Sequence, residues 1–188
     1  EYIRNIIMST LETNLIQPST GTTLTVGASG DQISAATGAK TSFLYPGFHA
    51  SKASGDQSLS DDTNTKLTFD TELFDSDNDF ATPAFTPTVA GKYYLYAQAY
   101  LANDNADIGL IELAIYKNGS LAAFHQHDHR TEMVGYNQIP NIMTIVDANG
   151  SSDYFEVYAK ADVSSASNLK VYGSADGYTY FGGYRIGT

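Results

Sequence analysis

The sequence predicts an all-β fold, an antiparallel β-sandwich, for most of this chain of 188 residues. From about residue 41 onward, short runs rich in apolar residues recur, and clusters of Gly, Asn, Asp and Ser separate them. Short strands at regular spacing with turn signals between them are typical of sandwiches and barrels. The composition agrees, because the chain holds 14 Tyr and 9 Phe, which favour strands. Helical periodicity is weak throughout.

The expected strands can be placed in order along the chain. The runs at residues 65–70 and 110–116 alternate regularly, and residues 93–101 form a long apolar run. Asn118-Gly119 follows the second alternating run, and this pair is typical of a two-residue hairpin, because a type I′ turn needs positive φ at both central positions. We expect strands at residues 43–50, 65–70, 93–101, 110–116, 142–146, 153–159, 168–172 and 178–186.

The first 40 residues differ in composition from the rest. Their only aromatic residue is Tyr2, and they are rich in Thr, Ser, Gly and Ala. Such a segment cannot fill a core alone, although residues 22–26 have a strand-like pattern. We therefore expect an N-terminal attachment or stalk segment at residues 1–40 and a head domain at residues 41–188, with a disordered leader as the alternative for the first. Residues 1–7 are expected to extend ahead of a natural start at Met8.

Charge and composition exclude several classes of partner. The net charge is −11 and no cluster of Lys or Arg exists, whereas nucleic-acid binding needs a basic face. Attraction to an anionic membrane surface is disfavoured for the same reason. No run of about 18 apolar residues exists, so we expect no membrane insertion. The chain has no Cys, so core packing or oligomerisation must hold it together.

The run at residues 93–101 has two apolar faces. Side chains alternate along a strand, so one face holds Tyr93, Leu95, Ala97 and Ala99 and the other is mostly Tyr. Only one face of a strand meets the core of a two-layer sandwich, so the second face needs another cover. The closing run at residues 178–186 is also rich in Tyr. We predict a subunit interface formed by Tyr94, Tyr96, Tyr100, Tyr178, Tyr180 and Tyr184; the alternative is that these rings pack under loops.

Four motifs, in one order, resemble complement C1q-like domains. Residues 85–96 (Phe-Thr-Pro-Thr-Val-Ala-Gly-Lys-Tyr-Tyr-Leu-Tyr) are similar to the family's Phe, Pro and Gly-x-Tyr signature with its aromatic strand. Residues 115–119 resemble its Lys-Asn-Gly hairpin, residues 153–157 its penultimate strand, and residues 180–187 its closing strand. The resemblance implies a jelly roll of the C1q and tumour necrosis factor type that forms a homotrimer through its aromatic strands. The chain lacks a collagen Gly-X-Y stalk, which argues against a complement-like protein.

The opening residues resemble a second group, the short fibre and tail proteins of bacteriophages. The likeness lies in residues 8–11, 14–18 and 21–27. It implies a virion protein whose N-terminal segment attaches to a tail or capsid protein and whose head binds a host receptor, a glycan or an envelope protein. Two other functions stay open. One is a structural decoration protein of capsid or tail without a receptor, and the other is a polysaccharide-degrading enzyme.

Three histidines alternate at His125, His127 and His129. Alternate residues on a strand share a face, so the three imidazoles can line up. Two of them per chain around a threefold axis would offer six nitrogens to a transition metal, which makes His125 and His127 candidate metal ligands. Together with Arg130, the three histidines are also candidates for ligand contact. The alternative is a polar edge strand after the hairpin, away from the axis.

Two acidic loops are further candidates. Residues 75–79 begin like a calcium loop but lack its central Gly and closing Glu. In the second loop, Asn103 and Asp104 are candidate ligand contacts, and Asp104 and Asp107 are candidate metal ligands. The alternative for both loops is a solvated turn. We expect no cofactor apart from calcium or a transition metal at these places.

The sequence offers little for catalysis. It has no Cys nucleophile, no Gly-x-Ser-x-Gly elbow, no Walker loop, no dinucleotide fingerprint and no His-Glu-x-x-His motif. A carboxylate pair for glycoside cleavage is the one enzymatic alternative. The Asp residues sit in turn clusters, where their side chains favour local backbone bonds. We therefore predict that the protein is not an enzyme.

Overall fold

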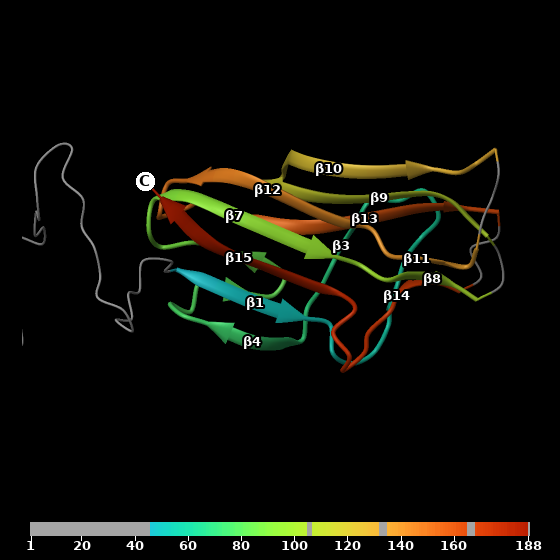
Figure 1. Cartoon of the computed structure of the whole chain (residues 1–188), viewed down its shortest axis with the longest axis horizontal. Coiled ribbons are helices and arrows are strands. Elements are labelled where there is room, and N and C mark those ends of the chain that lie inside the picture. Colours follow the sequence, from blue (N-terminus) through green and yellow to red (C-terminus); the bar gives the residue numbers. More distant parts are fainter. Residues whose placement is uncertain (1–45, 105–106, 132–134, 165–167, 188) are drawn as a thin grey trace, which may run out of the picture. The chain divides into compact units, whose positions relative to one another are not determined.

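The computed structural model describes residues 46–104, 107–131, 135–164 and 168–187. These residues form an all-β domain in which every strand pair is antiparallel (Figure 1). Among the described residues no helix is long and apolar enough to cross a membrane. The segment at residues 1–40 lies outside the described residues, and the division at residue 41 stays a prediction.

The strands of the described residues form three sheets. The order is β12-β7-β15-β1-β4 in the first, β10-β9-β13-β6-β5 in the second with β3 beside β13, and β11-β8-β14-β2 in the third. The bounds are β1 (Gly47–Ser51), β2 (Gln57–Ser58), β3 (Thr65–Lys66), β4 (Thr71–Asp75), β5 (Phe80–Ala81), β6 (Ala84–Phe85), β7 (Gly91–Gln98), β8 (Leu101–Asn103), β9 (Ile108–Lys117), β10 (Ser120–Asp128), β11 (Asn137–Gln138), β12 (Asn141–Ala148), β13 (Phe155–Val163), β14 (Leu169–Val171) and β15 (Tyr180–Gly187).

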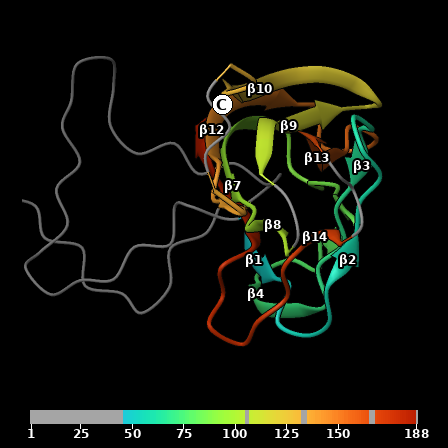
Figure 2. The ribbon, with the colours of Figure 1, turned by 90° about the vertical axis from the view of Figure 1, so that its right-hand side faces the viewer.

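The topology is that of a jelly roll rather than a simple meander. The last strand, β15, lies between β7 and β1, so the C-terminal strand pairs with the first described one. Figure 2 shows β12 and β1 along one side of the domain and β13 and β3 along the other. The core lies between these layers, and its largest fully buried side chains come from both, among them Phe48, Leu95, Leu113, Phe155 and Phe181. The predicted β-sandwich is confirmed.

The hairpin predicted at Asn118-Gly119 joins β9 to β10. Asn118 has a φ of 52° and Gly119 a φ of 75°, as the predicted turn type requires. Lys117 pairs with Ser120 directly across it. The strand that follows, β10, continues through the His-rich residues as the edge of its sheet.

The alternating run at residues 65–70 differs from the expected single strand. Only Thr65–Lys66 is β-strand, because the chain then crosses from one layer to the other. The Leu67 amide donates to the carbonyl of Val157 in β13, whereas the Asp70 amide donates to the carbonyl of Ser51 in β1. The buried side chains of Leu67 and Phe69 fill the core along this crossing, which explains the regular apolar alternation.

Candidate functional site: an uncovered aromatic sheet face

Apolar side chains form rows across the outer side of the five-stranded sheet. In one row, Met143 of β12 pairs with Tyr96 of β7, and Tyr96 with Gly182 of β15. The row continues through His49 of β1 to Phe74 of β4. The neighbouring rows add Ile145, Tyr94 and Tyr184 on one side and Tyr180 on the other. We call this surface the aromatic face; its residues are His49, Phe74, Tyr94, Tyr96, Met143, Ile145, Tyr180 and Tyr184.

The rings of the aromatic face contact one another. The ring centroids of Tyr94 and Tyr184 are 5.5 Å apart, and those of Tyr96 and Tyr180 are 6.1 Å apart. Gly182 makes this packing possible, because a Cβ atom there would come within 2.4 Å of the Tyr96 ring. The glycine at this position therefore lets the Tyr96 ring lie flat across β15.

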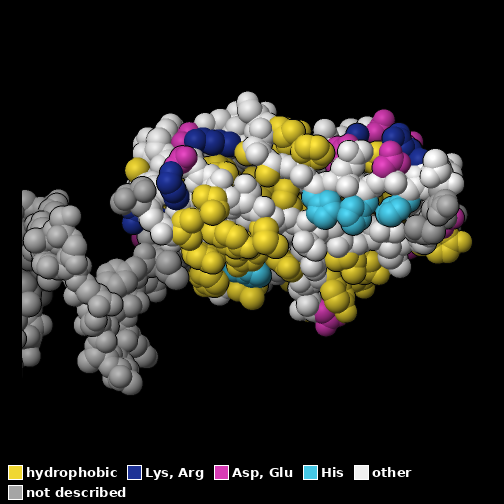
Figure 3. Space-filling model, turned by 45° about the horizontal axis from the view of Figure 1, so that its top comes forward, with side chains coloured by type: hydrophobic (Ala, Val, Ile, Leu, Met, Phe, Trp, Pro, Cys, Tyr) yellow, Lys and Arg dark blue, Asp and Glu magenta, His cyan; other side chains and the backbone are white. Residues whose placement is uncertain are grey.

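Much of this apolar surface is exposed. The four tyrosines are partly buried, but Met143 is 60% exposed, Ile145 59% and Phe74 54%. Figure 3 shows a broad hydrophobic area (yellow) on this side of the molecule. Contiguous apolar patches of this kind mark interaction sites in soluble proteins. The alternation predicted for residues 93–101 is confirmed, since Tyr93, Leu95, Ala97 and Ala99 are buried in the core while Tyr94, Tyr96, Gln98 and Tyr100 are only partly buried.

His49 is the titratable group at the centre of the aromatic face. Its Nδ1 lies 2.9 Å from the Tyr96 hydroxyl oxygen, and its ring stacks on Tyr180 with centroids 5.4 Å apart. Burial lowers the pKa of His49 below its ordinary value. Burial, together with the neighbouring tyrosines, raises the pKa of Tyr96. Both shifts favour the uncharged forms, so the hydrogen bond joins a neutral imidazole and a neutral hydroxyl.

Tyr100 and Tyr178 lie in a second aromatic cluster. Both predicted interface residues pack against Tyr172, a residue that sequence reasoning did not single out. The Tyr100 centroid lies 5.3 Å from that of Tyr172 and 5.7 Å from that of Tyr178. The three rings line a hollow of about 570 Å³ together with Ala102, Asp104, Asn137, Ile139, Lys170 and Asp176. We call it the tyrosine hollow; its wall combines aromatic rings with carboxylates, an amide and an ammonium group.

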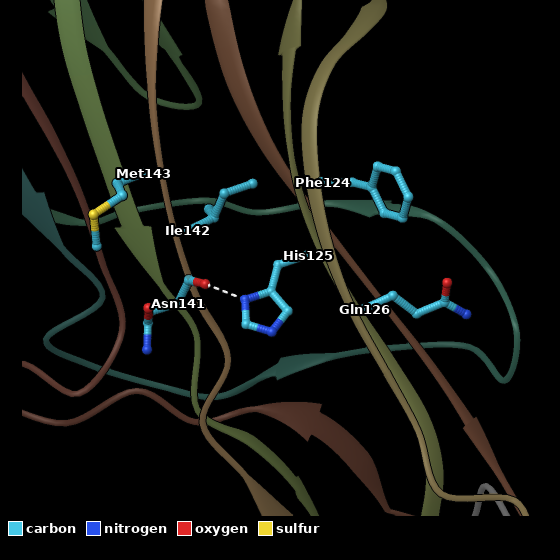
Figure 4. Close-up of a pocket in the computed structure, with 6 residues that line it drawn as sticks. All are labelled: Phe124, His125, Gln126, Asn141, Ile142 and Met143. Carbon is cyan, nitrogen blue, oxygen red and sulfur yellow. Dashed lines mark hydrogen bonds between the residues drawn. The ribbon is translucent and has the colours of Figure 1, made fainter.

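The His-rich residues lie at an edge of the sandwich. His125 and His127 belong to the edge strand β10, and their Nε2 atoms are 2.7 Å apart. His125 also places its Nδ1 2.7 Å from the carbonyl oxygen of Asn141, the first residue of β12 (Figure 4). In this way His125 bridges the edges of two sheets, beside a hollow of about 640 Å³ lined by Phe124, His125, Gln126, Asn141, Ile142 and Met143.

Arg130 is held by neighbouring carboxylates. Its guanidinium binds both carboxylate oxygens of Asp128, with Nε 2.9 Å from Oδ1, and lies 3.6 Å from Asp162. The hydrogen bonds from Arg130 lower the pKa of Asp128 to about 2. His129 follows β10, and its amide donates to the carbonyl of Gly109. The side chain of Arg130 is thus already paired within the chain.

The acidic loops bind backbone amides. The carboxylate of Asp75 accepts a hydrogen bond from the Phe80 amide at 2.8 Å, and that of Asp79 accepts one from the Thr88 amide at 3.0 Å. In the second loop Asp104 lies 3.1 Å from the Lys170 ammonium, while Asn103 is fully buried. No group of three or more potential ligands for a metal ion occurs in the part of the chain that the structure describes, which includes Asp107 but not residues 105–106. Calcium at these loops remains a prediction.

Comparison with solved structures identifies the fold. Two crystal structures of murine APRIL, at pH 5.0 and pH 8.0, each align with a TM-score of 0.54 and 12% sequence identity, over 74% of this chain and 98% of theirs. A third, at pH 8.5, aligns with a TM-score of 0.53 and 13% identity over the same shares. The sequence matches no protein-family model and no curated protein. At this identity the likeness concerns the fold alone, and the described part of the chain has the jelly-roll fold of the tumour necrosis factor and C1q type.

Proposed function

We propose that this chain is a bacteriophage virion protein, a short homotrimeric tail or head fibre whose jelly-roll head binds the host cell surface. The observation that carries the proposal is the uncovered aromatic face on a fold of the tumour necrosis factor type. The resemblance of residues 8–27 to phage fibre and tail proteins supports the location on the virion. In this proposal residues 1–40 attach the trimer to a tail or capsid protein.

The aromatic face supports assembly of three copies of the chain. A solvated sheet face carries polar side chains, whereas this one presents four tyrosines, Met143 and Ile145. Tyr rings suit subunit interfaces because they tolerate partial burial. The exposed Met143 and Ile145 lie on the edge strand β12, so the edge of one copy can pack on the sheet of the next. A contact of this head-to-tail kind closes into a ring when the rotation between copies allows it.

The tyrosine hollow is the surface that we assign to the receptor. Ring faces of Tyr100, Tyr172 and Tyr178 can stack on the apolar faces of sugar rings. Polar groups of Asp104 and Asn137 can bind hydroxyl groups at the same place. A trimer carries three such hollows, so each can be weak while the whole particle binds firmly to a dense glycan surface. This chemistry favours a glycan over an envelope protein as the receptor.

Charge substitutions on β12 test the assembly. In Ile145→Glu a carboxylate would be buried at the interface without a partner, which costs several kcal/mol. About 1.4 kcal/mol corresponds to a tenfold change, so we expect association to weaken more than about a hundredfold. Light scattering on the full chain should give three times the chain mass of 20.3 kDa for the wild type and the single chain mass for the variant.

Leu121→Glu is the matched control for this experiment. Leu121 is 54% exposed, similar to Ile145, but belongs to β10 in the other sheet. The control should stay trimeric, and circular dichroism should show both variants folded. A wild-type protein with the mass of one chain contradicts the assembly, as does a trimer that Ile145→Glu leaves intact.

The His49–Tyr96 contact predicts acid sensitivity of the protein. The pKa of His49 is lowered in the folded protein, so the unfolded chain binds more protons once the pH falls below the ordinary value of 6.5. The free energy of unfolding is therefore fully retained above about pH 6.5 and decreases as the pH falls from there toward the lowered pKa. Urea unfolding of the trimer between pH 7.5 and pH 5, with fixed protein concentration, measures it.

His49→Gln should reduce this pH dependence, because glutamine does not titrate. His129→Gln, just after β10, is the control and should keep the wild-type slope. The carboxylates whose pKa values are lowered, such as that of Asp153, change the free energy of unfolding only at lower pH. They therefore do not contribute to the slope measured here. Equal slopes for the wild type and His49→Gln would refute the role of His49.

Substitution in the tyrosine hollow tests receptor binding. We expect the wild-type trimer to bind members of a panel of immobilised bacterial surface glycans. Tyr178→Ser should weaken this binding about five- to thirtyfold, since loss of one ring costs about 1–2 kcal/mol. Leu121→Glu should bind like the wild type. Unchanged glycan binding by Tyr178→Ser would show that the receptor site lies elsewhere on the head.

The same variant separates recognition from a purely structural role. Phage particles that carry Tyr178→Ser should assemble normally and adsorb poorly. A low yield of assembled particles, with unchanged adsorption by those that do assemble, would instead support a protein that decorates the capsid or joins tail parts. Shortened glycan chains after incubation with the purified trimer would support an enzyme.

A further inference from the structure

The two imidazoles of His125 and His127 converge on one point of the surface. They project from the same side of the edge strand β10, and their ring centroids are 4.5 Å apart. Their Nε2 atoms are the closest pair, at 2.7 Å. Figure 3 shows histidine side chains (cyan) in a row beside the hydrophobic area, open to solvent. Figure 4 shows that Phe124 and Gln126 point away from His125.

The protonation of His125 follows from its partner. A backbone carbonyl only accepts hydrogen bonds, so Nδ1 of His125, which faces the Asn141 carbonyl at 2.7 Å, carries the hydrogen. In the neutral imidazole the lone pair then lies on Nε2, directed at His127. A histidine whose second nitrogen is anchored on a carbonyl is the arrangement that orients metal-binding imidazoles in proteins.

We propose that His125 and His127 bind a late divalent transition metal ion, such as Ni²⁺, Cu²⁺ or Zn²⁺, through their Nε2 atoms. Metal–nitrogen bonds of about 2.0–2.1 Å at angles of about 90–110° place two nitrogens about 2.9–3.4 Å apart. The pair reaches this spacing when the rings separate by a few tenths of an ångström. The hydrogen that His127 shares with His125 moves to Nδ1 of His127, so both ligands are neutral imidazoles.

The surroundings make this an open site rather than a closed structural one. The nearest acidic side chain in sequence, Asp128, is engaged by Arg130. The His129 ring lies farther along, with its centroid 5.7 Å from that of His127. The described residues contain no group of three or more potential ligands. Water or an external donor therefore fills the remaining positions, and imidazole nitrogens select the metals named above over calcium or magnesium.

The test uses the untagged full chain and Ni²⁺ as the probe. Isothermal titration with nickel chloride should show one Ni²⁺ per chain. His125→Gln and His127→Gln should each weaken binding about tenfold or more, because each removes one of two protein ligands. His129→Gln is the matched control and should change the affinity less than about threefold. Electron paramagnetic resonance of the Cu²⁺-loaded protein should show coupling to two imidazole nitrogens.

Two results would overturn the site. One is wild-type affinity no greater than that of the double variant His125→Gln/His127→Gln. The other is a larger loss in His129→Gln than in His125→Gln. The electron paramagnetic resonance spectrum of the Cu²⁺-loaded wild-type protein tests the site without any variant. Coupling to fewer than two nitrogens would exclude His125 and His127 as joint ligands. None of these measurements depends on receptor binding or on assembly.

Discussion

The organisation of this domain depends on one constraint: the strands β7 and β15 carry apolar side chains on both of their faces. One face, with Tyr93, Leu95 and Phe181, fills the core between the layers. The opposite face carries tyrosines in contact with one another and remains partly open. A two-layer sandwich covers only the first of these faces. Exposure of the second face to water costs hydrophobic free energy, and contact with further copies of the chain would recover it.

The polar features of the head flank the aromatic face. The tyrosine hollow takes residues from β8, β11, β14 and the segments next to them and before β15, whereas the histidine pair lies on the edge strand β10. The histidine pair projects from a strand, whereas the three tyrosines of the hollow lie just outside the ends of β8, β14 and β15. This division fits a protein in which one surface joins the subunits and other surfaces contact ligands.

Sequence reasoning located most of the long strands, although not β4, and it identified the buried face of β7 because period-two alternation is a local property. It placed the hairpin at Asn118-Gly119 because positive φ is a local demand on residue type. It did not separate Tyr100 and Tyr178 from the aromatic face, because their contact with Tyr172 joins two segments that lie far apart in the sequence. The bond between His125 and Asn141 was likewise beyond reach, since it depends on which edges of the two sheets meet. Alternation at residues 65–70 indicated burial correctly, although the chain there crosses between layers.

Hydroxyl-radical footprinting of the full chain tests most directly whether the aromatic face is covered in solution. Tyr136, which is 54% exposed, provides an internal reference for an open tyrosine. The account predicts that Tyr94, Tyr96 and Tyr184 are modified far more slowly than Tyr136, and more slowly than their partial exposure on a single chain allows. Modification of these three tyrosines at rates that match a single solvated chain would contradict it.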